Sequence, residues 1–526
     1  MNLLLWDDWP RVLLPLPVVL PLSAAGLTLA LARRPRAQRT ISVTALSTVV
    51  AAAVAMLVLT DRGNGTYSIA VGGWPSRLGI PLVADRLSTL MLVVSSVVTL
   101  AVLLYSLAQG VADGEEGAPV SIYHPTYLVL SAGVSNAFLS GDLFNLFVGF
   151  EILLAASYIL LTLGGTRARV RAGTTYVVVS LLSSLVFLTA IALVYAATGT
   201  VNLAELSVRL RDVDPDVQLV LHLLLLVGFG IKAAVFPLSA WLPDSYPTAP
   251  APVTAVFAGL LTKVGVYAII RTETLLFPDG RAADLLLWVA LATMLVGILG
   301  AVAQNDVKRL LSFTLVSHIG YMVFGIALGT GAGLSGAVFY VVHHITVQTT
   351  LFLVTGLVER YAGTTSLDGL GSLTRRTPLL AVLFFVPALN LAGIPPFSGF
   401  VGKLGLLQAG VDVGTRPAHV LVAGGVLTSL LTLYAVAAVW NRAFWQEPQV
   451  TPDRDAVAGL PTATRVGTRT PLGMLVPTAA LVAVGAGLTV VAGPLFGVSD
   501  RAAQDLRERT PYTDSVLRGG ASEGAP

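Results

Sequence analysis

Apolar stretches of roughly 20 residues recur along the whole chain, separated by short polar connections. An α-helix of that length crosses the hydrocarbon core of a bilayer. The pattern therefore predicts an all-α polytopic membrane protein. We expect 14 spanning helices, at residues 12–32, 40–60, 84–108, 124–141, 143–163, 171–197, 217–241, 248–271, 284–303, 308–329, 333–358, 376–411, 418–445 and 471–493.

Two of these spans, the seventh and the twelfth, contain residues that interrupt a helix. The seventh holds Gly228, Gly230 and Pro237, and the twelfth holds Pro395 and Pro396. Proline removes a backbone donor and clashes with the preceding turn, so both helices should be broken there. Non-helical backbone at membrane depth is tolerated only inside protein or against a wet cavity. Each break therefore predicts an internal, hydrated site.

The two broken spans occupy corresponding places in two sets of five helices, spans 4–8 and 9–13. Because five is an odd number, the second set should be inverted relative to the first, as in many transporters. We expect repeats at 124–271 and 284–445, after three N-terminal helices within 1–123. A flexible cytoplasmic loop (446–470), a last helix (471–493) and a polar C-terminal tail without a membrane-surface helix (494–526) should follow.

The amino-acid composition excludes several classes of function. Only 12% of the residues are charged and the mean hydropathy is +0.80, about half the charge of a soluble protein. The net charge of +3 is scattered over short loops, so no nucleic-acid-binding patch is present. The absence of cysteine excludes disulfides and cysteine-ligated Fe–S or zinc sites. We therefore expect no bound cofactor and no redox chemistry in this chain.

Basic residues concentrate in the connections that follow the odd-numbered spans. The positive-inside rule makes that side cytoplasmic, with both termini outside the cell membrane. The residues concerned are Arg33, Arg34, Arg36, Arg39, Arg167, Arg169, Arg171, Lys308, Arg309, Arg360, Arg375, Arg376 and Arg442.

Three of the four lysines, Lys232, Lys263 and Lys403, lie in the middle of apolar spans, and Lys308 is placed in a polar connection. A cation at the centre of a bilayer costs about 2.5–3.5 kcal/mol or more, so such residues usually have a function. A desolvated lysine can release its proton, whereas arginine cannot. The distribution of lysines therefore points to proton or cation transport.

Glu151, in the middle of the fifth span, is the clearest acid among apolar residues, and Lys232 is its natural partner. Close contact would favour the charged form of the lysine, and separation would favour proton release. The alternative is a static ion pair that locks two helices, although such a pair is usually no more stabilising than apolar packing.

Histidines in two later spans could pass protons without a large pKa change: His318 in the tenth, and His343 and His344 in the eleventh. Consecutive helical residues point about 100° apart, so only one of the last two needs to face the path. His222, near the outer end of the seventh span, is a weaker candidate. Equally, a buried histidine is often only a hydrogen-bonded core residue. A metal site from these histidines lacks the usual ligand spacing.

Three stretches resemble the antiporter-like membrane subunits shared by Mrp-type Na+/H+ antiporters and respiratory complex I. The resemblance covers roughly residues 80–445, and the stretch in the fifth span is most similar to the D-type Mrp subunits. The stretches are GDLFNLFVGFE (141–151), KAAVFPLSAWLPD (232–244) and LAGIPPFSGF (391–400), the last followed by Lys403.

The resemblance implies 14 helices, inverted five-helix repeats and a hydrated central axis. It places the glutamate of helix 5 at Glu151, the lysines of helices 7, 8 and 12 at Lys232, Lys263 and Lys403, and the histidine of helix 11 at His344.

One position departs from the family pattern. Many of these relatives carry lysine where this chain has Gln348, and glutamine cannot bind a proton at neutral pH. We therefore expect His318 or His344 to bridge that position.

The sequence thus predicts a proton-translocating, non-enzymatic membrane subunit of a multi-subunit antiporter that exchanges protons for Na+ or another monovalent cation. Its partners should be other membrane subunits. The expected path runs from the cytoplasm near Lys232, through Lys263, His318 and His344, to Lys403 and outward.

Two alternatives remain. One is a pump subunit of NADH–quinone oxidoreductase, N- or M-like, or of a related membrane hydrogenase; the short tail argues against the L-like type, which the resemblance associates with a long lateral helix. The other is a catalytic role in which the histidines hold a metal or a quinone.

Overall fold

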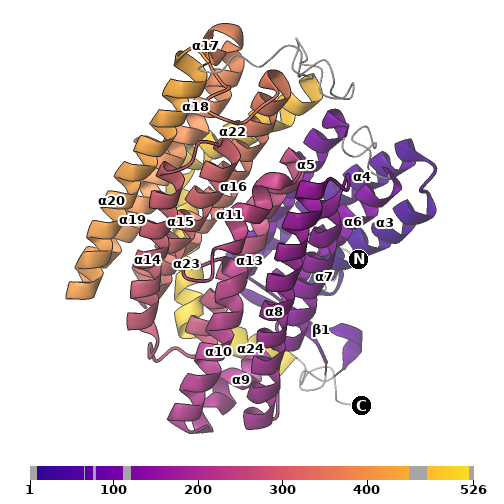
Figure 1. Ribbon diagram of the computed structural model, residues 1–526. Helices are drawn as coiled ribbons and strands as arrows, with labels where there is room; N and C mark the ends of the chain where they lie inside the picture. Colours follow the sequence, from indigo (N-terminus) through magenta and orange to yellow (C-terminus); the bar gives the residue numbers. More distant parts are fainter. Residues whose placement is uncertain (1–8, 64, 75–78, 111–119, 449–470, 520–526) are drawn as a thin grey trace.

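The computed structural model describes residues 9–63, 65–74, 79–110, 120–448 and 471–519, and its helices run mostly side by side (Figure 1). Within these residues, 12 helices are long and apolar enough to cross a membrane. They are α2–α3 (Trp9–Leu13, Leu16–Ala30), α4 (Pro35–Arg62), α5 (Arg86–Gln109), α7 (Leu143–Thr162), α8 (Arg167–Thr198), α10 (Pro215–Ala233), α12–η5–α13–η6 (Ala251–Val256, Phe257–Leu261, Thr262–Arg271, Thr272–Leu276), α14 (Ala283–Val302), α15 (Val307–Ala327), α16 (Gly331–Ala362), α20–η7 (Arg416–Val439, Trp440–Trp445) and α22 (Leu472–Val490).

The polytopic helical fold is thus confirmed, whereas the expected number of 14 spans is not established by length and composition. The other two expected spans correspond to α6 (Val120–Leu139) and to the pair α18 (Pro378–Ala392) and α19 (Ser398–Val413). The predicted twelfth span is therefore two short helices, neither of which is long enough to cross a bilayer alone.

The seventh span is broken as predicted. Helix α10 ends at Ala233, Ala234 has a left-handed backbone (φ 58°), and an irregular segment leads to the short helix α11 (Trp241–Ser245). The end of α10 packs tightly on α13: a Cβ atom added to Gly265 would lie 2.6 Å from the backbone nitrogen of Ala233. This close approach fixes the levels of Lys232 and Lys263, which neighbour these two residues in sequence.

A matching pair of backbone contacts occurs in the two halves, at opposite ends of the molecule. Asp142 caps α7 and bridges to Asn202, just before α9 (Leu203–Arg209); Asp306 caps α15 and bridges to Ser366, shortly before α17 (Leu373–Arg376). Figure 1 places α9 and α17 at opposite ends. An inverted repeat would produce this relationship, so the arrangement supports the predicted repeats.

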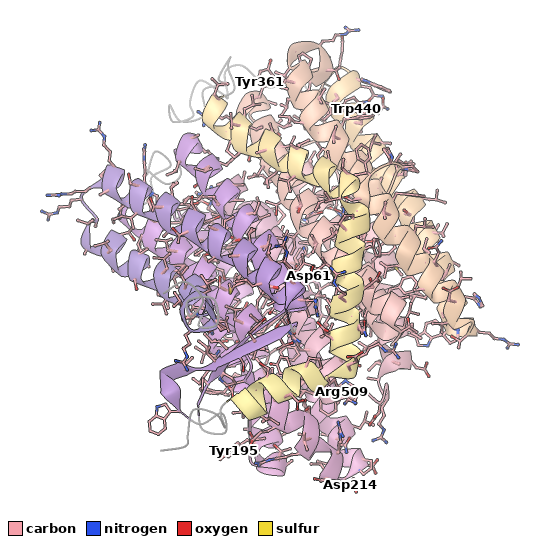
Figure 2. All side chains as sticks on the ribbon, turned by 180° about the vertical axis from the view of Figure 1, so that it is seen from behind. Asp61, Tyr195, Asp214, Tyr361, Trp440 and Arg509 are labelled. Carbon is pink, nitrogen blue, oxygen red and sulfur yellow. The ribbon has the colours of Figure 1, made fainter. Side chains whose placement is uncertain are left out.

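Two regions differ from the all-α, polar-tail expectation. Strands β1 (Thr66–Ala70) and β2 (Pro81–Asp85) form an antiparallel hairpin. The predicted tail contains two helices, α23 (Ala492–Glu508) and α24 (Thr510–Gly519), which pack along the back of the protein (Figure 2). Several of their charged side chains pair with residues far away in the sequence. Arg501 contacts Asp61 at 2.8 Å, for example.

The molecule has two distinct ends. Tyr361 and Trp440 mark one end in Figure 2, and Tyr195, Asp214 and Arg509 mark the other. We call the first the arginine-rich end, because arginines of several connections make contacts there, and the second the tail end, because the C-terminal helix α24 lies there. The contacts at the arginine-rich end are Arg309 to Asp244 (2.8 Å), Arg169 to the Thr248 carbonyl (3.3 Å) and Arg442 to Asp368 (2.5 Å).

The expectation that Lys308 lies in a polar connection is wrong. It occupies the first turn of α15, is largely buried, and pairs with Glu359 at 2.7 Å. The expected cytoplasmic loop falls mostly on residues 449–470, outside the described residues. The remaining short elements are η1 (Val71–Gly73), η3 (Leu210–Asp212) and η4 (Tyr246–Thr248).

Candidate functional site

Glu151 and Lys232 meet through a third residue, Ser184 of α8. The Nζ atom of Lys232 lies 3.9 Å from Oε1 of Glu151 and donates a 3.2 Å hydrogen bond to the Ser184 hydroxyl, which itself donates to Glu151. Lys232 also lies over the ring of Phe150, 4.8 Å from its centre. Its side chain is 4% exposed and that of Glu151 is 34% exposed. The carboxylate therefore lies at the edge of the subunit and the ammonium inside it.

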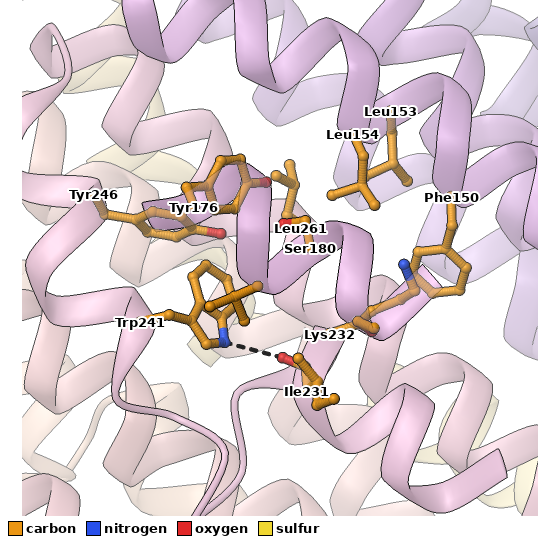
Figure 3. A pocket seen from close by; sticks show the side chains of 12 residues that line it. Phe150, Leu153, Leu154, Tyr176, Ser180, Ile231, Lys232, Trp241, Tyr246 and Leu261 are labelled. Carbon is orange, nitrogen blue, oxygen red and sulfur yellow. Dashed lines mark hydrogen bonds between the residues drawn. The ribbon is translucent and has the colours of Figure 1, made fainter. Parts of the chain in front are cut away.

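A small cavity adjoins Lys232 (Figure 3). Its volume is about 20 Å³, enough for roughly one water molecule. Tyr176, Trp241 and Tyr246 form its aromatic wall, and the Trp241 indole donates a 3.1 Å hydrogen bond to the Ile231 carbonyl. Because α11 and η4 follow the break in the seventh span, the break lets Trp241 and Tyr246 line the same cavity as Lys232.

Lys263 is completely buried in α13, and its Nζ atom donates a 2.6 Å hydrogen bond to the Ala258 carbonyl. Ala258 lies in the π-helical segment η5, a type of irregularity that is frequent at functional sites. Among the described residues, no acid lies within ion-pair distance of Lys263. The fully buried cation is therefore held by a neutral carbonyl.

The histidines of α15 and α16 form one buried cluster. His318 Nδ1 lies 2.6 Å from the Tyr340 hydroxyl, and the rings of His318 and His344 are 5.2 Å apart. His343 turns toward α19, where its Nδ1 atom lies 3.0 Å from the Ser398 hydroxyl. The charges of Lys263 and Lys403 both act on His344 and on His318. The histidine cluster therefore lies near both lysines.

Lys403 binds the backbone that the break in the twelfth span exposes. Its Nζ atom donates hydrogen bonds to the carbonyls of Leu391 (3.0 Å) and Ala392 (2.9 Å) and to the Ser429 hydroxyl (3.1 Å). Gly393, at φ +85°, ends α18, and a Cβ atom there would lie 2.8 Å from Cδ of Lys403. A larger residue would therefore displace the lysine.

Several polar atoms in this region have no hydrogen-bond partner among the described residues. They are both ring nitrogens of His344, Nε2 of His318 and His343, and Oε1 of Gln348. Gln348 uses its Nε2 atom to donate a 2.7 Å hydrogen bond to the Leu311 carbonyl. Leaving buried polar groups unpaired costs about 1–3 kcal/mol each, and protein interiors commonly satisfy such groups with water.

The structure thus brings five of the six main candidates into two groups. Glu151 and Lys232 form the first, and His318 and His344 the core of the second. Lys403 joins the second through Tyr321, whose ring centre lies 5.2 Å from the lysine Nζ atom and 5.7 Å from the ring centre of His318. Lys263, the sixth, interacts electrostatically with His344. His222 lies elsewhere, paired with Glu273. Among the described residues, no three His, Cys, Asp or Glu side chains form a group that could hold a metal.

Sequence reasoning missed the hydroxyl groups that connect these residues, namely those of Ser184, Tyr340, Ser398 and Ser429. Serine and tyrosine are common in apolar helices, and many serines simply bond the preceding turn of their own helix. What distinguishes these four hydroxyl groups is that each lies near a lysine or a histidine in three dimensions, and the sequence does not show this.

Comparison with known proteins agrees with this geometry. The transmembrane family of NADH:quinone oxidoreductases and Mrp antiporters matches residues 140–432. Two curated relatives are the D-type subunit of the Na(+)/H(+) antiporter of Alkalihalophilus pseudofirmus, 38% identical over 96% of this chain and 99% of that protein, and its namesake in Bacillus subtilis, 36% identical with the same coverage.

A solved structure shares the fold over nearly its whole length. A chain of the Mrp complex from Dietzia sp. DQ12-45-1b superposes with a TM-score of 0.88 and 35% identity, covering 98% of this chain and 100% of that one. Family match, identity and coverage together lead to one conclusion: the chain belongs to the transmembrane family shared by NADH:quinone oxidoreductases and Mrp antiporters.

Proposed function

We propose that this chain is a proton-translocating membrane subunit of a multi-subunit Na+/H+ antiporter. The observation that carries the proposal is the burial of Lys232, Lys263, His344 and Lys403 within the helices, each 8% exposed or less. Desolvation disfavours the charged form of such groups, so each can accept and release a proton. Full-length similarity to proteins named as the D-type subunit of such an antiporter supports the same function.

Protons would move by successive transfer between these groups. An ammonium group gives its proton to a neighbouring base, directly or through a water molecule, and becomes a neutral amine that can accept the next one. We place the sequence of transfers from Lys232 to Lys263, then to His318 and His344, and then to Lys403. We call these five residues the row. His343, bonded to Ser398, and Gln348 lie beside this row and would orient water.

Glu151 would control the first transfer. Contact with the carboxylate stabilises the ammonium form of Lys232, and loss of that contact lets desolvation favour the neutral amine. The 3.9 Å separation, bridged by Ser184, is a geometry from which small movements can strengthen or weaken the contact.

We place the arginine-rich end in the cytoplasm, because connections rich in arginine and lysine stay on that side of a membrane. Protons would then be exchanged with the cytoplasm near Lys232 and with the outside beyond Lys403. Both ends of the chain would lie outside.

The second candidate is a pump subunit of an NADH:quinone oxidoreductase, because the matching family includes both kinds of protein. The proteins that co-purify with the native chain distinguish the two. Small membrane proteins of the Mrp type would support the antiporter, whereas Fe–S and flavin proteins would support the oxidoreductase.

Vesicle experiments test the row itself. Glu151→Ala, Lys232→Ala, Lys403→Ala and Lys403→Arg should each abolish Na+-driven proton exchange while the complex still assembles; the arginine cannot release its proton. Lys308→Ala is the matched control, because this fourth lysine pairs with Glu359 outside the row and should retain exchange. Full activity in any of the first four variants would remove that residue from the path.

A further inference from the structure

A buried histidine–glutamate pair lies apart from the row, toward the tail end. His222 of α10 and Glu273 of η6 approach to 2.5 Å between Nε2 and Oε1, and their side chains are only 2% and 9% exposed. The histidine ring stacks on Phe277, with ring centres 4.4 Å apart. His222 precedes Lys232 by about three turns of α10, roughly 15 Å along the helix.

Glu273 borders a cavity of about 270 Å³. The cavity lies where both halves of the protein meet the tail, and Thr274, Ile326, Leu334, Arg507 and Arg509 also line it. It is large enough for several water molecules. The pair is therefore buried in protein on one side and next to a partly polar space on the other.

This cavity continues toward the surface of the tail end. A second, more open hollow of about 460 Å³ is lined by Gly331, Asp500, Gln504, Arg507 and Glu508. Arg507 lines both spaces, so they adjoin at this residue. Figure 2 shows the neighbouring Arg509 at the same end as Asp214, which caps α10. The pair thus lies next to two neighbouring hollows at the tail end.

The charges around the cavity favour a proton over a metal cation. Arg507 and Arg509 line the cavity together with the carboxylate, and Arg509 interacts in turn with Arg211 and Asp279. The described parts of α14, α15 and α16 contribute only uncharged lining residues. Arg271, two residues before Glu273, is bound to Asp85 at 2.5 Å. Two guanidinium groups for one carboxylate oppose the residence of Na+.

An apolar layer separates the pair from the lysines. Most buried side chains in the intervening turns of α10 and α13 are apolar: Leu225, Leu226, Phe229, Val266, Ile269 and Ile270. The polar exceptions Tyr267 and Arg271 bond to each other, and Arg271 bonds to Asp85. Among the described residues, no hydrogen bond links the pair to Lys232 or Lys263. Transfer onward would require water to enter the layer.

We propose that His222 and Glu273 form a proton-loading site for the tail end of the antiporter subunit; this inference rests on the function proposed above. The imidazole accepts a proton that reaches it through water in the cavity, next to the Glu273 carboxylate. Release of that proton restores the starting pair. The site sets how strongly exchange depends on the pH at the tail end.

The test uses the whole antiporter complex, reconstituted in liposomes in one orientation, with the pH varied separately on each side. In Glu273→Gln and His222→Asn, the tail-side pH of half-maximal Na+-driven exchange should move by about one unit or more, which is about tenfold in proton concentration. The profile on the arginine-rich side should not move. Asp216→Asn is the control, because this residue lies on α10 with its side chain 95% exposed and should leave both profiles unchanged.

An unchanged tail-side profile in assembled Glu273→Gln would overturn the loading site. So would lower thermal stability without a profile shift, since the pair would then serve only packing. If that variant fails to assemble, Glu273→Asp decides: a smaller shift of the tail-side profile supports the site, and none rejects it. Lys232→Ala, measured in parallel, separates the two proposals. Retained exchange in Lys232→Ala would contradict the proposed proton path, whereas an unchanged tail-side profile in Glu273→Gln would contradict only the loading site.

Discussion

The Nζ atom of Lys232 and the Oε1 atom of Glu151 lie 3.9 Å apart, and the hydroxyl of Ser184 bonds to both. A hydroxyl can donate to one partner while accepting from another. The serine therefore transmits the position of the carboxylate to the ammonium, although the two charges make no direct hydrogen bond at this distance.

Replacing Ser184 with alanine should slow Na+-driven proton exchange about tenfold without preventing assembly, because a hydrogen bond to a charged group contributes about 1.5–3 kcal/mol. Exchange rates in vesicles that contain equal amounts of complex provide the measurement. Ser183→Ala is the matched control: its hydroxyl bonds the Gly228 carbonyl and touches neither charge. Equal rates in both variants would exclude the coupling role.

Gln348→Lys should fold and keep proton exchange. The lysine ammonium can still donate to the Leu311 carbonyl, and the substitution removes the Gln348 amide oxygen, which has no partner among the described residues. Gln348→Leu removes this hydrogen bond, although the Thr314 hydroxyl still donates to the same carbonyl at 2.9 Å, and should lower stability by about 1 kcal/mol. Thermal unfolding should show that Gln348→Lys is more stable than Gln348→Leu, and exchange rates should show that Gln348→Lys is active. A folded but inactive Gln348→Lys complex would show that the row does not tolerate another cation there.

Asp142→Asn should make the protein more stable at neutral pH and reduce the dependence of stability on pH. Burial raises the pKa of Asp142 from 3.8 to about 6, although the backbone N–H groups of Asn145 and Phe144 oppose the shift. The folded state thus binds this proton more tightly than the unfolded state. The stabilisation is complete below about pH 4 and is lost as the pH rises through about 6.

Asparagine caps a helix as well as aspartate does, so Asp142→Asn should gain up to about 3 kcal/mol at pH 7. Melting temperatures of the complex between about pH 4 and 8, the range that spans both pKa values, measure the effect. Asp306→Asn alters the matching cap of the second half and serves as the comparison. If wild type and Asp142→Asn show the same pH dependence, the buried carboxyl does not contribute.

Arg86→Ala should loosen the C-terminal helix α23. Arg86 binds Asp61 at 3.2 Å and Asp505 at 2.6 Å, and its side chain is 11% exposed. Its removal takes away the cation that joins α23 to α5, at a cost of about 1–3 kcal/mol. Faster proteolysis within α23 would reveal the change. Arg501→Ala removes a half-exposed partner of the same Asp61 and should cost less than about 1 kcal/mol.

The sequence was sufficient to locate the lysines and the broken helices. Lys232, Lys263 and Lys403 stand out because each is a cation within a long apolar stretch, and no compensating acid follows at helical spacing for the last two. Pro237 and the pair Pro395–Pro396 predict breaks for a purely local reason, since proline cannot complete the backbone ladder.

The packing around those lysines could not be predicted in the same way. Ser184 is one of several serines in α8, and only the approach of α7 and α10 selects it. Glu273 lies just beyond the expected eighth span (248–271), and its pairing with His222 depends on the contact of two helices. Helix α23 was missed because its partners, such as Asp61 and Arg86, lie more than 400 residues away in sequence.

The hydrogen bonds of Lys403 connect the two short helices of the broken twelfth span. The carbonyls of Leu391 and Ala392 belong to the end of α18, whereas the ammonium belongs to α19. Sliding of α18 against α19 would lengthen both contacts at once and weaken the hold of the carbonyl oxygens on the ammonium. In the proposed proton path, such a movement would favour release of the lysine's proton.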